Sequence, residues 1–257
     1  MTLFEEVNKL SDDEVYEFVR DAVFAGGFCC PRCGCEEVVF VSTRRVYRCK
    51  HCGKWFSVKS VSILRKSHLT LKQWLLIFAL FAEEKGLTAT KLAKRLGIAY
   101  NTAYLALHKV RAVMRKVIEE DGSFKNVMGA FFLVPGISRR QRESKTPSQI
   151  LEVSEHTEWV HIHLVEKQVR VLQGRRVFKR REKEQFGLGE VIRGVKSLLG
   201  GVYHGGCWKH TQRYLDEFCF RWNMEQKEYF WRVVESLRVE ALPWKWLKAE
   251  PIVLLAV

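Results

Sequence analysis

Four of the eight cysteines in this 257-residue chain form two Cys-x-x-Cys pairs with the spacing of a metal site. The pairs are Cys30 with Cys33 and Cys49 with Cys52, and a glycine follows each pair. Four thiolates at this spacing can surround one Zn²⁺ tetrahedrally, and glycine accepts the positive φ that such a turn requires. The alternatives are a disulfide pair or free buried thiols. We favour zinc, because both pairs have the same form and nothing else in the sequence indicates secretion.

The segments around the second pair predict a small β-structure. Residues 38–41 and 45–47 have the pattern of a β-hairpin, and residues 55–58 that of a third strand. Together they predict a zinc ribbon over residues 27–62, which is too small to hold together without its metal. Four protein ligands leave the zinc no open coordination position, so we expect a structural metal.

The net charge of +14 is unevenly distributed along the chain. Residues 1–21 carry a net charge of −5, and residues 22–126 carry +12. A positive field of this kind favours nucleic acid as the partner, through phosphate neutralisation and counterion release. The alternative is an ordinary solvated basic surface.

Other features bear on the compartment. The first ten residues do not have the pattern of a signal peptide, and no apolar run approaches the roughly 20 residues that span a bilayer. The cysteine usage does not resemble a secreted disulfide framework. We therefore expect a cytoplasmic, nucleoid-associated protein with no membrane partner.

Three helices are predicted after the ribbon. The first covers residues 69–84, with Thr70 as its N-cap and Gly86 as its stop. Thr88 caps the second helix at residues 89–96, and Gly97 separates it from a longer helix at about residues 99–118. A small residue at position 93 and the turn glycine are typical of a DNA-binding helix-turn-helix, which we predict over residues 63–120. The alternative is a helical hairpin within a core.

The helix-turn-helix prediction selects two groups of candidate DNA contacts. The residues expected to reach base edges are Tyr100, Asn101, Thr102, Tyr104 and Leu105. The residues expected to contact phosphates are Lys91, Lys94, Arg95, His108, Lys109 and Arg111.

Two blocks of the sequence resemble one known family. The first consists of residues 47–58 (Tyr-Arg-Cys-Lys-His-Cys-Gly-Lys-Trp-Phe-Ser-Val), 71–75, 91–98 and 107–111, and the second of residues 201–204, 209–210 and 212–223. They are similar to insertion-sequence transposases of the DDE superfamily that carry an N-terminal zinc ribbon and helix-turn-helix (the ISXO-two-like group). The resemblance implies duplex DNA as the partner, at the terminal inverted repeats of a transposon. A homodimer on the DNA is left open.

The same resemblance implies a ribonuclease H-like catalytic domain with three carboxylates around two Mg²⁺ ions. The first aspartate would fall within residues 127–136, which contain no acid, and residues 138–187 contain no aspartate. The only carboxylates in that second segment are Glu143, Glu152, Glu155, Glu158, Glu166, Glu182 and Glu184. The third acid would fall near Glu190, the weak catalytic candidate, with the register off by about one residue. Because Mg²⁺ requires oxygen ligands, we expect an impaired catalytic centre, with Mg²⁺ needed only if the chain is active.

The expected architecture is α+β and multidomain. The expected domains are an acidic N-terminal helix (1–26), the zinc ribbon (27–62), the helix-turn-helix (63–120), a shortened ribonuclease H-like transposase domain (121–240) and a tail (241–257). Strands are predicted near residues 160–165 and 170–172, and one long helix at 211–237 ends the catalytic remnant. The alternatives to an impaired transposase are a transcription regulator with the same two modules and an active, divergent DDE enzyme using two Mg²⁺.

Overall fold

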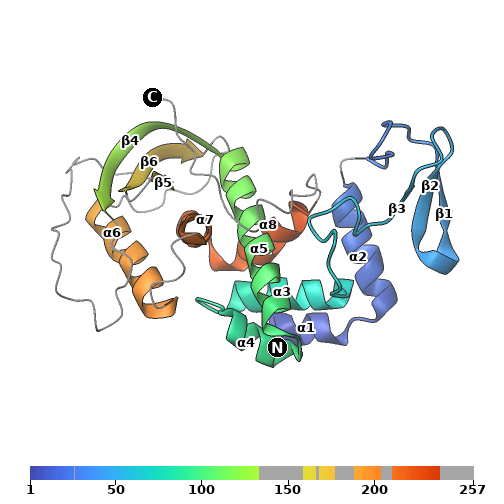
Figure 1. The fold of residues 1–257 in the computed structure, drawn as a ribbon, viewed down its shortest axis with the longest axis horizontal. Helices are drawn as coiled ribbons and strands as arrows, with labels where there is room; N and C mark the ends of the chain where they lie inside the picture. Colours follow the sequence, from blue (N-terminus) through green and yellow to red (C-terminus); the bar gives the residue numbers. More distant parts are fainter. Residues whose placement is uncertain (26, 133–158, 166–167, 177–187, 204–209, 238–257) are drawn as a thin grey trace. The chain divides into compact units, whose positions relative to one another are not determined.

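The computed structural model divides the chain into two compact units, whose elements are labelled in Figure 1. It describes residues 1–25, 27–132, 159–165, 168–176, 188–203 and 210–237. The first unit contains the described residues of 1–87, 95–97 and 227–237, and the second contains those of 88–94 and 98–226. Within this described part, no helix is long and apolar enough to cross a membrane.

The first unit combines helices with a three-stranded sheet. Its elements are α1 (Leu3–Lys9), α2 (Asp12–Phe24), β1 (Val38–Val41), β2 (Val46–Cys49), β3 (Trp55–Phe56), α3 (Leu71–Glu83) and α8 (Tyr229–Glu235). The strands are antiparallel in the order β1-β2-β3. The predicted hairpin and third strand are therefore confirmed, with β2 longer and β3 shorter than expected.

Two helices occupy the acidic N-terminal segment, where a single helix was expected. Leu10 is extended and ends α1, and Ser11 then begins α2. The Ser11 side chain accepts a hydrogen bond from the Glu14 backbone N–H, and the Glu14 side chain accepts one from the Ser11 N–H. This capping box satisfies two backbone donors and starts a new helix. Val15 and Val19 then lie on the buried face of α2.

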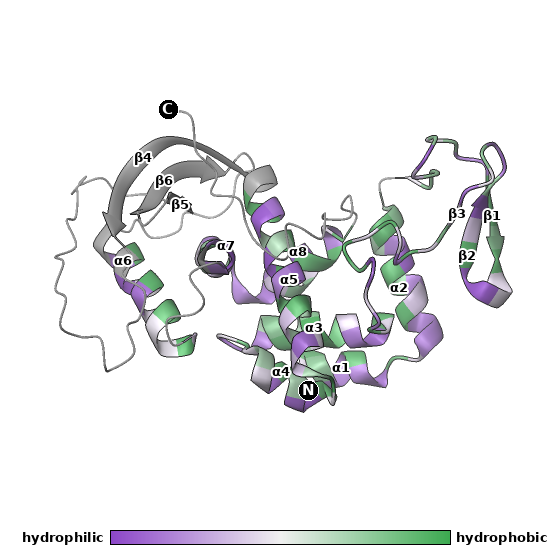
Figure 2. Cartoon of the chain, viewed as in Figure 1, coloured by the Kyte–Doolittle hydropathy of each residue, from purple (hydrophilic) through white to green (hydrophobic). Residues whose placement is uncertain are grey.

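The core of the first unit is formed by α3. All nine residues from position 74 to position 82 are buried, and Figure 2 shows hydrophobic residues along much of this helix. A helix that is apolar on most sides must be covered on most sides, and α1, α2 and α8 all pack against it. Thr70 caps α3 as predicted, through a capping box with Gln73.

The second unit contains helices and a second sheet. Its elements are α4 (Ala89–Leu96, of which residues 95 and 96 are assigned to the first unit), α5 (Tyr100–Asp121), β4 (Gly122–Phe132), β5 (Trp159–Val165), β6 (Gln168–Arg176), α6 (Leu188–Ser197) and α7 (Thr211–Asn223). The strands are antiparallel in the order β4-β6-β5, and α5 packs against α7. Helices α4 and α5 begin within a residue of the predicted positions. A five-residue π-helical turn, Leu198–Val202, continues α6.

The predicted long helix at residues 211–237 is wrong. Helix α7 ends at Asn223, Met224 is extended, and a 3₁₀ turn (Gln226–Glu228) precedes α8. The two helices also belong to different units. The apolar residues that suggested one continuous stripe therefore form two buried faces, one on each helix. The periodicity of a sequence shows that a helix face is apolar, but it does not show where the elements packed against that face change.

Candidate metal centre and nucleic-acid interface

The four paired cysteines converge on one point between the two turns that carry them. Their sulfur atoms all lie within 4.8 Å of one another, and the Cys30–Cys52 and Cys33–Cys49 sulfur pairs are each separated by 3.6 Å. Zinc–sulfur bonds of about 2.3 Å in a tetrahedron place the sulfurs about 3.8 Å apart. A disulfide requires about 2.05 Å. The spacing therefore fits four thiolates around one Zn²⁺.

The two turns have the same backbone construction. The N–H of Gly34 donates to the carbonyl of Cys30 over 2.9 Å, and the N–H of Gly53 donates to that of Cys49 over 3.1 Å. Both glycines have positive φ, +71° and +66°, which residues with a Cβ rarely adopt. This matches the role predicted for the glycine after each pair.

Backbone amides also point at the metal-binding sulfurs. The N–H of Arg32 lies 3.4 Å from the Cys30 sulfur, and that of Cys52 lies 3.5 Å from the Cys49 sulfur. The Cys52 N–H, helped by the Cys33 thiol and the His51 N–H, lowers the pKa of the Cys49 thiol to about 6, against the opposing effect of burial. Because zinc binds the thiolate, these amides favour the ligating form. Among the described residues, these four cysteines are the only group of three or more His, Cys, Asp or Glu side chains placed to hold a metal.

The other described cysteines lie outside this site. Cys29 and Cys35 are half-buried, and Cys219 is buried in α7. The Cys35 backbone supports the first turn twice: its carbonyl accepts the Cys30 N–H over 2.9 Å, and its N–H is hydrogen-bonded to the Cys33 thiol. Cys207 lies outside the described residues.

An arginine at the tip of the hairpin and a tyrosine in β2 both join the ribbon to α2. Arg45 has a left-handed backbone (φ 49°), and its guanidinium pairs with the Asp13 carboxylate and lies 5.2 Å from the Tyr16 ring centroid. The Tyr16 hydroxyl is also hydrogen-bonded to that of Tyr47 in β2 over 3.0 Å. These contacts give the ribbon a defined orientation on the acidic helix.

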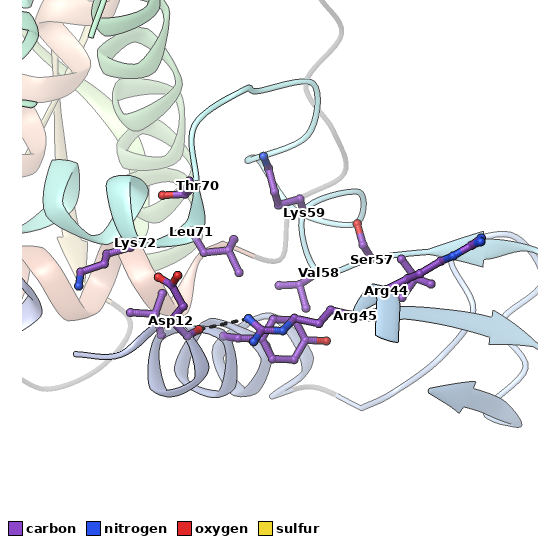
Figure 3. Close-up of a pocket in the computed structure, with 12 residues that line it drawn as sticks. Asp12, Arg44, Arg45, Ser57, Val58, Lys59, Thr70, Leu71 and Lys72 are labelled. Atoms are coloured by element: carbon purple, nitrogen blue, oxygen red, sulfur yellow. Dashed lines mark hydrogen bonds between the residues drawn. The ribbon is translucent and has the colours of Figure 1, made fainter. Parts of the chain in front are cut away.

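A pocket of about 390 Å³ lies beside this joint. Figure 3 shows that the ammonium ends of Lys59 and Lys72 point away from the apolar side chains of Val58 and Leu71. Lys59 donates to backbone carbonyls at Ser67 and Leu69, over 2.7 and 2.8 Å, and Lys72 donates to that of Leu10 over 2.7 Å. Both ammonium groups therefore tie backbone segments around the pocket together, and Arg44 and Arg45 also line it.

The candidate DNA contacts on α4 and at the start of α5 fall into two classes of exposure. The side chains of Lys91, Lys94, Arg95, Tyr100 and Asn101 are exposed, whereas Thr102, Tyr104 and Leu105 are half-buried. Arg95 lies 3.9 Å from the Glu84 carboxylate and stacks on Phe4 at 5.4 Å. Gly97, at the turn between the helices, has φ +63°.

Three expected phosphate contacts are wrong. His108, Lys109 and Arg111 are buried, with relative exposures of 0%, 7% and 2%. Arg111 donates from Nε to the Glu217 carboxylate over 2.8 Å and from a terminal nitrogen to the Tyr203 hydroxyl over 3.2 Å. Its charge is therefore used inside the second unit. The sequence carries no local signal for this, because Glu217 is 106 residues away.

Glu217 is the centre of a buried network that the sequence did not identify. It also accepts a hydrogen bond from Tyr203 over 2.7 Å and one from Arg221, in the same helix, over 3.0 Å. Burial alone would raise the pKa of its carboxyl, but the two guanidinium groups hold that pKa below its usual value. Arg111 also stacks on the Tyr214 ring at 4.5 Å. The network connects α5, α7 and the turn after α6.

The weak catalytic candidate, Glu190, lies in the first turn of α6 with its side chain 52% exposed. Within the described part of the chain, its carboxylate pairs with Arg193 at 3.9 Å. The first-aspartate segment falls partly in β4, at residues 127–132, and otherwise outside the described residues. The remaining acids of the middle segment (Glu143, Glu152, Glu155, Glu158, Glu166, Glu182 and Glu184) also lie outside them.

Comparison with known proteins identifies the N-terminal module. Residues 10–55 match the family model described as a transposase zinc-ribbon domain (IS1595 type). The match covers α2, the first two ribbon strands, all four zinc-site cysteines and the first residue of β3. It therefore supports a transposase relationship, and it treats the helix and the ribbon as one module. Searches of curated proteins and of solved structures each found no match.

Proposed function

We propose that this chain is a transposase-family protein that recognises the terminal inverted repeats of a mobile element in duplex DNA. The observation that carries the proposal is the match of the cysteine-bearing module to transposase zinc-ribbon domains, together with four sulfurs spaced for one Zn²⁺. The zinc holds the ribbon together and does no chemistry. The charge of +12 on residues 22–126 supports the choice of DNA as the partner.

The proposed reading element is a helix-turn-helix formed by α4 and α5. Asn101 is exposed in the first turn of α5, and an asparagine amide can form two hydrogen bonds to adenine in the major groove. Lys91 and Lys94 are exposed on the preceding helix and suit the phosphates that fix the register. The proposed interface also includes Tyr100, Thr102, Tyr104 and Arg95. It no longer includes His108 and Arg111, because both side chains are buried.

The catalytic part is proposed to be an impaired ribonuclease H-like remnant. Two Mg²⁺ ions about 4 Å apart need several anionic oxygens to hold them. The sequence offers no acid in residues 127–136 and no aspartate in residues 138–187, and Glu190 lies beside an arginine. The chain is therefore proposed to bind transposon ends without cutting them, and to need no Mg²⁺ for that binding.

A selection of binding sites from random duplexes tests the function. The expected result is one site that also occurs, as an inverted repeat, on both sides of the gene. A site that occurs only upstream of genes would indicate a transcription regulator and contradict the proposal. The matched variants are Asn101→Ala, which should broaden the selected site, and Lys109→Ala, which removes a buried charge rather than a DNA contact.

A further inference from the structure

The ribbon sheet has one covered face and one open face. On the covered face, Tyr47 and Phe56 are buried, with ring centroids 5.5 Å apart, and the Tyr47 hydroxyl is hydrogen-bonded to that of Tyr16 in α2. Phe40, on the outer strand of this face, is 45% exposed and lies 4.9 Å from the Tyr47 ring and 6.2 Å from the Tyr16 ring. Successive side chains of a strand alternate between the faces. The neighbours of these aromatic residues must therefore lie on the other face.

A row of three side chains crosses that open face. The strand register pairs Val39 with Arg48 and Arg48 with Trp55, so the three residues are adjacent across β1, β2 and β3. Val39 is 45% exposed and Trp55 is 49% exposed. The Arg48 guanidinium lies 5.6 Å from the Trp55 ring centroid. An indole left open on a small sheet, with a cation beside it, is the arrangement of a binding surface.

The charge around the row selects the partner. Residues 27–62 contain seven Lys and Arg residues and two Glu residues. One of the glutamates, Glu37, already lies 3.6 Å from Lys50. A strongly basic surface that carries an open aromatic ring complements a nucleic acid, whose phosphates are anionic and whose bases have flat apolar faces.

We propose that the open ribbon face binds an unpaired base of single-stranded DNA, with Trp55 stacking on the base and Arg48 contacting an adjacent phosphate. The bases of a continuous duplex are covered on both faces by their neighbours, so an aromatic ring on a sheet can stack only on a base that is unpaired or at a strand end. The inference rests on the proposed DNA-binding role. It adds a second surface, separate from α4 and α5, that reads an open strand rather than a duplex.

Binding of the full-length zinc-loaded chain to labelled oligonucleotides of about 12 nucleotides tests this surface, since single-strand sites span about 4 to 16 nucleotides. Trp55→Leu should weaken binding to the single strand about tenfold or more, because stacking on one base changes affinity by roughly 5- to 150-fold. Trp231→Leu is the matched control, since Trp231 is also about half exposed, at 52%, but lies in α8. A strand of equal length with abasic sites keeps the phosphates but lacks the bases. The parent chain should bind this strand as weakly as the Trp55→Leu variant binds the intact strand.

Three further measurements distinguish a stacking site from a nonspecific basic surface. Arg48→Ala should weaken single-strand binding more than Arg44→Ala, which removes an exposed charge from the hairpin tip; equal losses would reduce the effect to general electrostatics and overturn the site. Duplex affinity for transposon ends should be unchanged in Trp55→Leu and reduced in Asn101→Ala, so the inference can fail while the duplex role stands. Tighter binding of an RNA strand than of a DNA strand would overturn the choice of DNA as the partner. A change of oligomeric state in Trp55→Leu would indicate instead that the open face contacts a second copy of the chain. Zinc content confirms that each variant keeps its ribbon.

Discussion

Arg111 of α5 and Glu217 of α7 form an ion pair in the interior of the second unit, with 2.8 Å between Nε and Oε2. Their side chains are 2% and 0% exposed, and they pair across 106 residues of sequence. Tyr203 and Arg221 bond the same carboxylate, so the desolvated charge is fully paired. A pair of this kind gives little net stability, but removing one member leaves the other charge buried and alone.

Glu217→Gln should therefore destabilise the chain by about 3–5 kcal/mol, the range measured when one member of a buried pair is removed. The control is Glu235→Gln, since Glu235 lies 3.7 Å from Arg232 with its side chain 64% exposed and surface pairs contribute about 0–1 kcal/mol. Urea unfolding of both variants measures the difference. Equal losses would mean that the buried network does not hold α5 against α7.

The network also shows where sequence reasoning stops. The cysteine pairs, the Thr70 cap and the Thr88 cap are encoded within a few residues, so their positions were predicted correctly. Arg111 is different, because a basic residue on an amphipathic helix carries no mark of whether it faces phosphate or a distant carboxylate. The local sequence placed it at the DNA, and a contact across 106 residues places it in the interior.

The same limit explains the division of the C-terminal helical region. Tyr214 and Tyr229 both fit one apolar stripe along residues 211–237, yet they belong to different helices and different units. A hydrophobic pattern reports that a face is buried but does not identify what covers it. The family match supports the zinc module that the cysteine pairs predicted; the helix-turn-helix and the catalytic remnant stay predictions.

Zinc should be present at one ion per chain and should depend on the second cysteine pair. Cys49→Ser removes a ligand whose thiol pKa is lowered to about 6 and should lose the metal and unfold the ribbon. Cys35→Ser is the control, because Cys35 is not one of the four clustered sulfurs and the backbone N–H and carbonyl that it contributes to the first turn are kept in serine. Metal analysis of the purified chains gives the answer. Full zinc retention in Cys49→Ser would reject the four-cysteine site.

Stability should fall with acid from about pH 6.5 because of His108. Neither ring nitrogen of this buried histidine has a hydrogen-bond partner among the residues that the structure describes, and burial, together with Arg111, His210 and Arg213, lowers its pKa from 6.5 to about 2. The unfolded chain therefore binds a proton below pH 6.5 that the folded chain does not accept. The free energy of unfolding should then decrease by up to about 1.4 kcal/mol per pH unit.

The effect of His108 can be measured alone between pH 6.5 and 4.5. Below pH 4.5 the unfolded chain also protonates Glu217, whose pKa in the folded chain is lowered from 4.5, so a second loss of stability begins there. His108→Leu removes the titrating ring and should flatten the pH dependence within the window. Unfolding free energies at four or five pH values measure the slope. A slope that is the same in the variant and the parent would assign the acid sensitivity to other groups.

Duplex recognition should separate into base contacts and phosphate contacts. Asn101→Ala should cost about 1–3 kcal/mol on the selected site and little on random DNA, because a bidentate base contact is lost. Lys94→Ala should weaken binding to every duplex and reduce the slope of log K against log salt by about one. Fluorescence anisotropy at several salt concentrations measures both. Equal effects of the two variants on specific and random DNA would argue against α5 as the reading helix.

Strand cleavage and transfer should be absent with either Mg²⁺ or Mn²⁺ on the cognate ends. The Glu190 side chain is half exposed and pairs with the cation Arg193 at 3.9 Å. That neighbourhood opposes the assembly of two divalent ions, which need several converging anionic oxygens. A gel assay on labelled end duplexes, run at protein concentrations that saturate binding, should show shifted DNA and no cut product. Glu190→Ala should bind the ends as tightly as the parent chain. Product formed by the parent and abolished in Glu190→Ala would show that the catalytic centre is intact, and that its other ligands come from the acids of the middle segment.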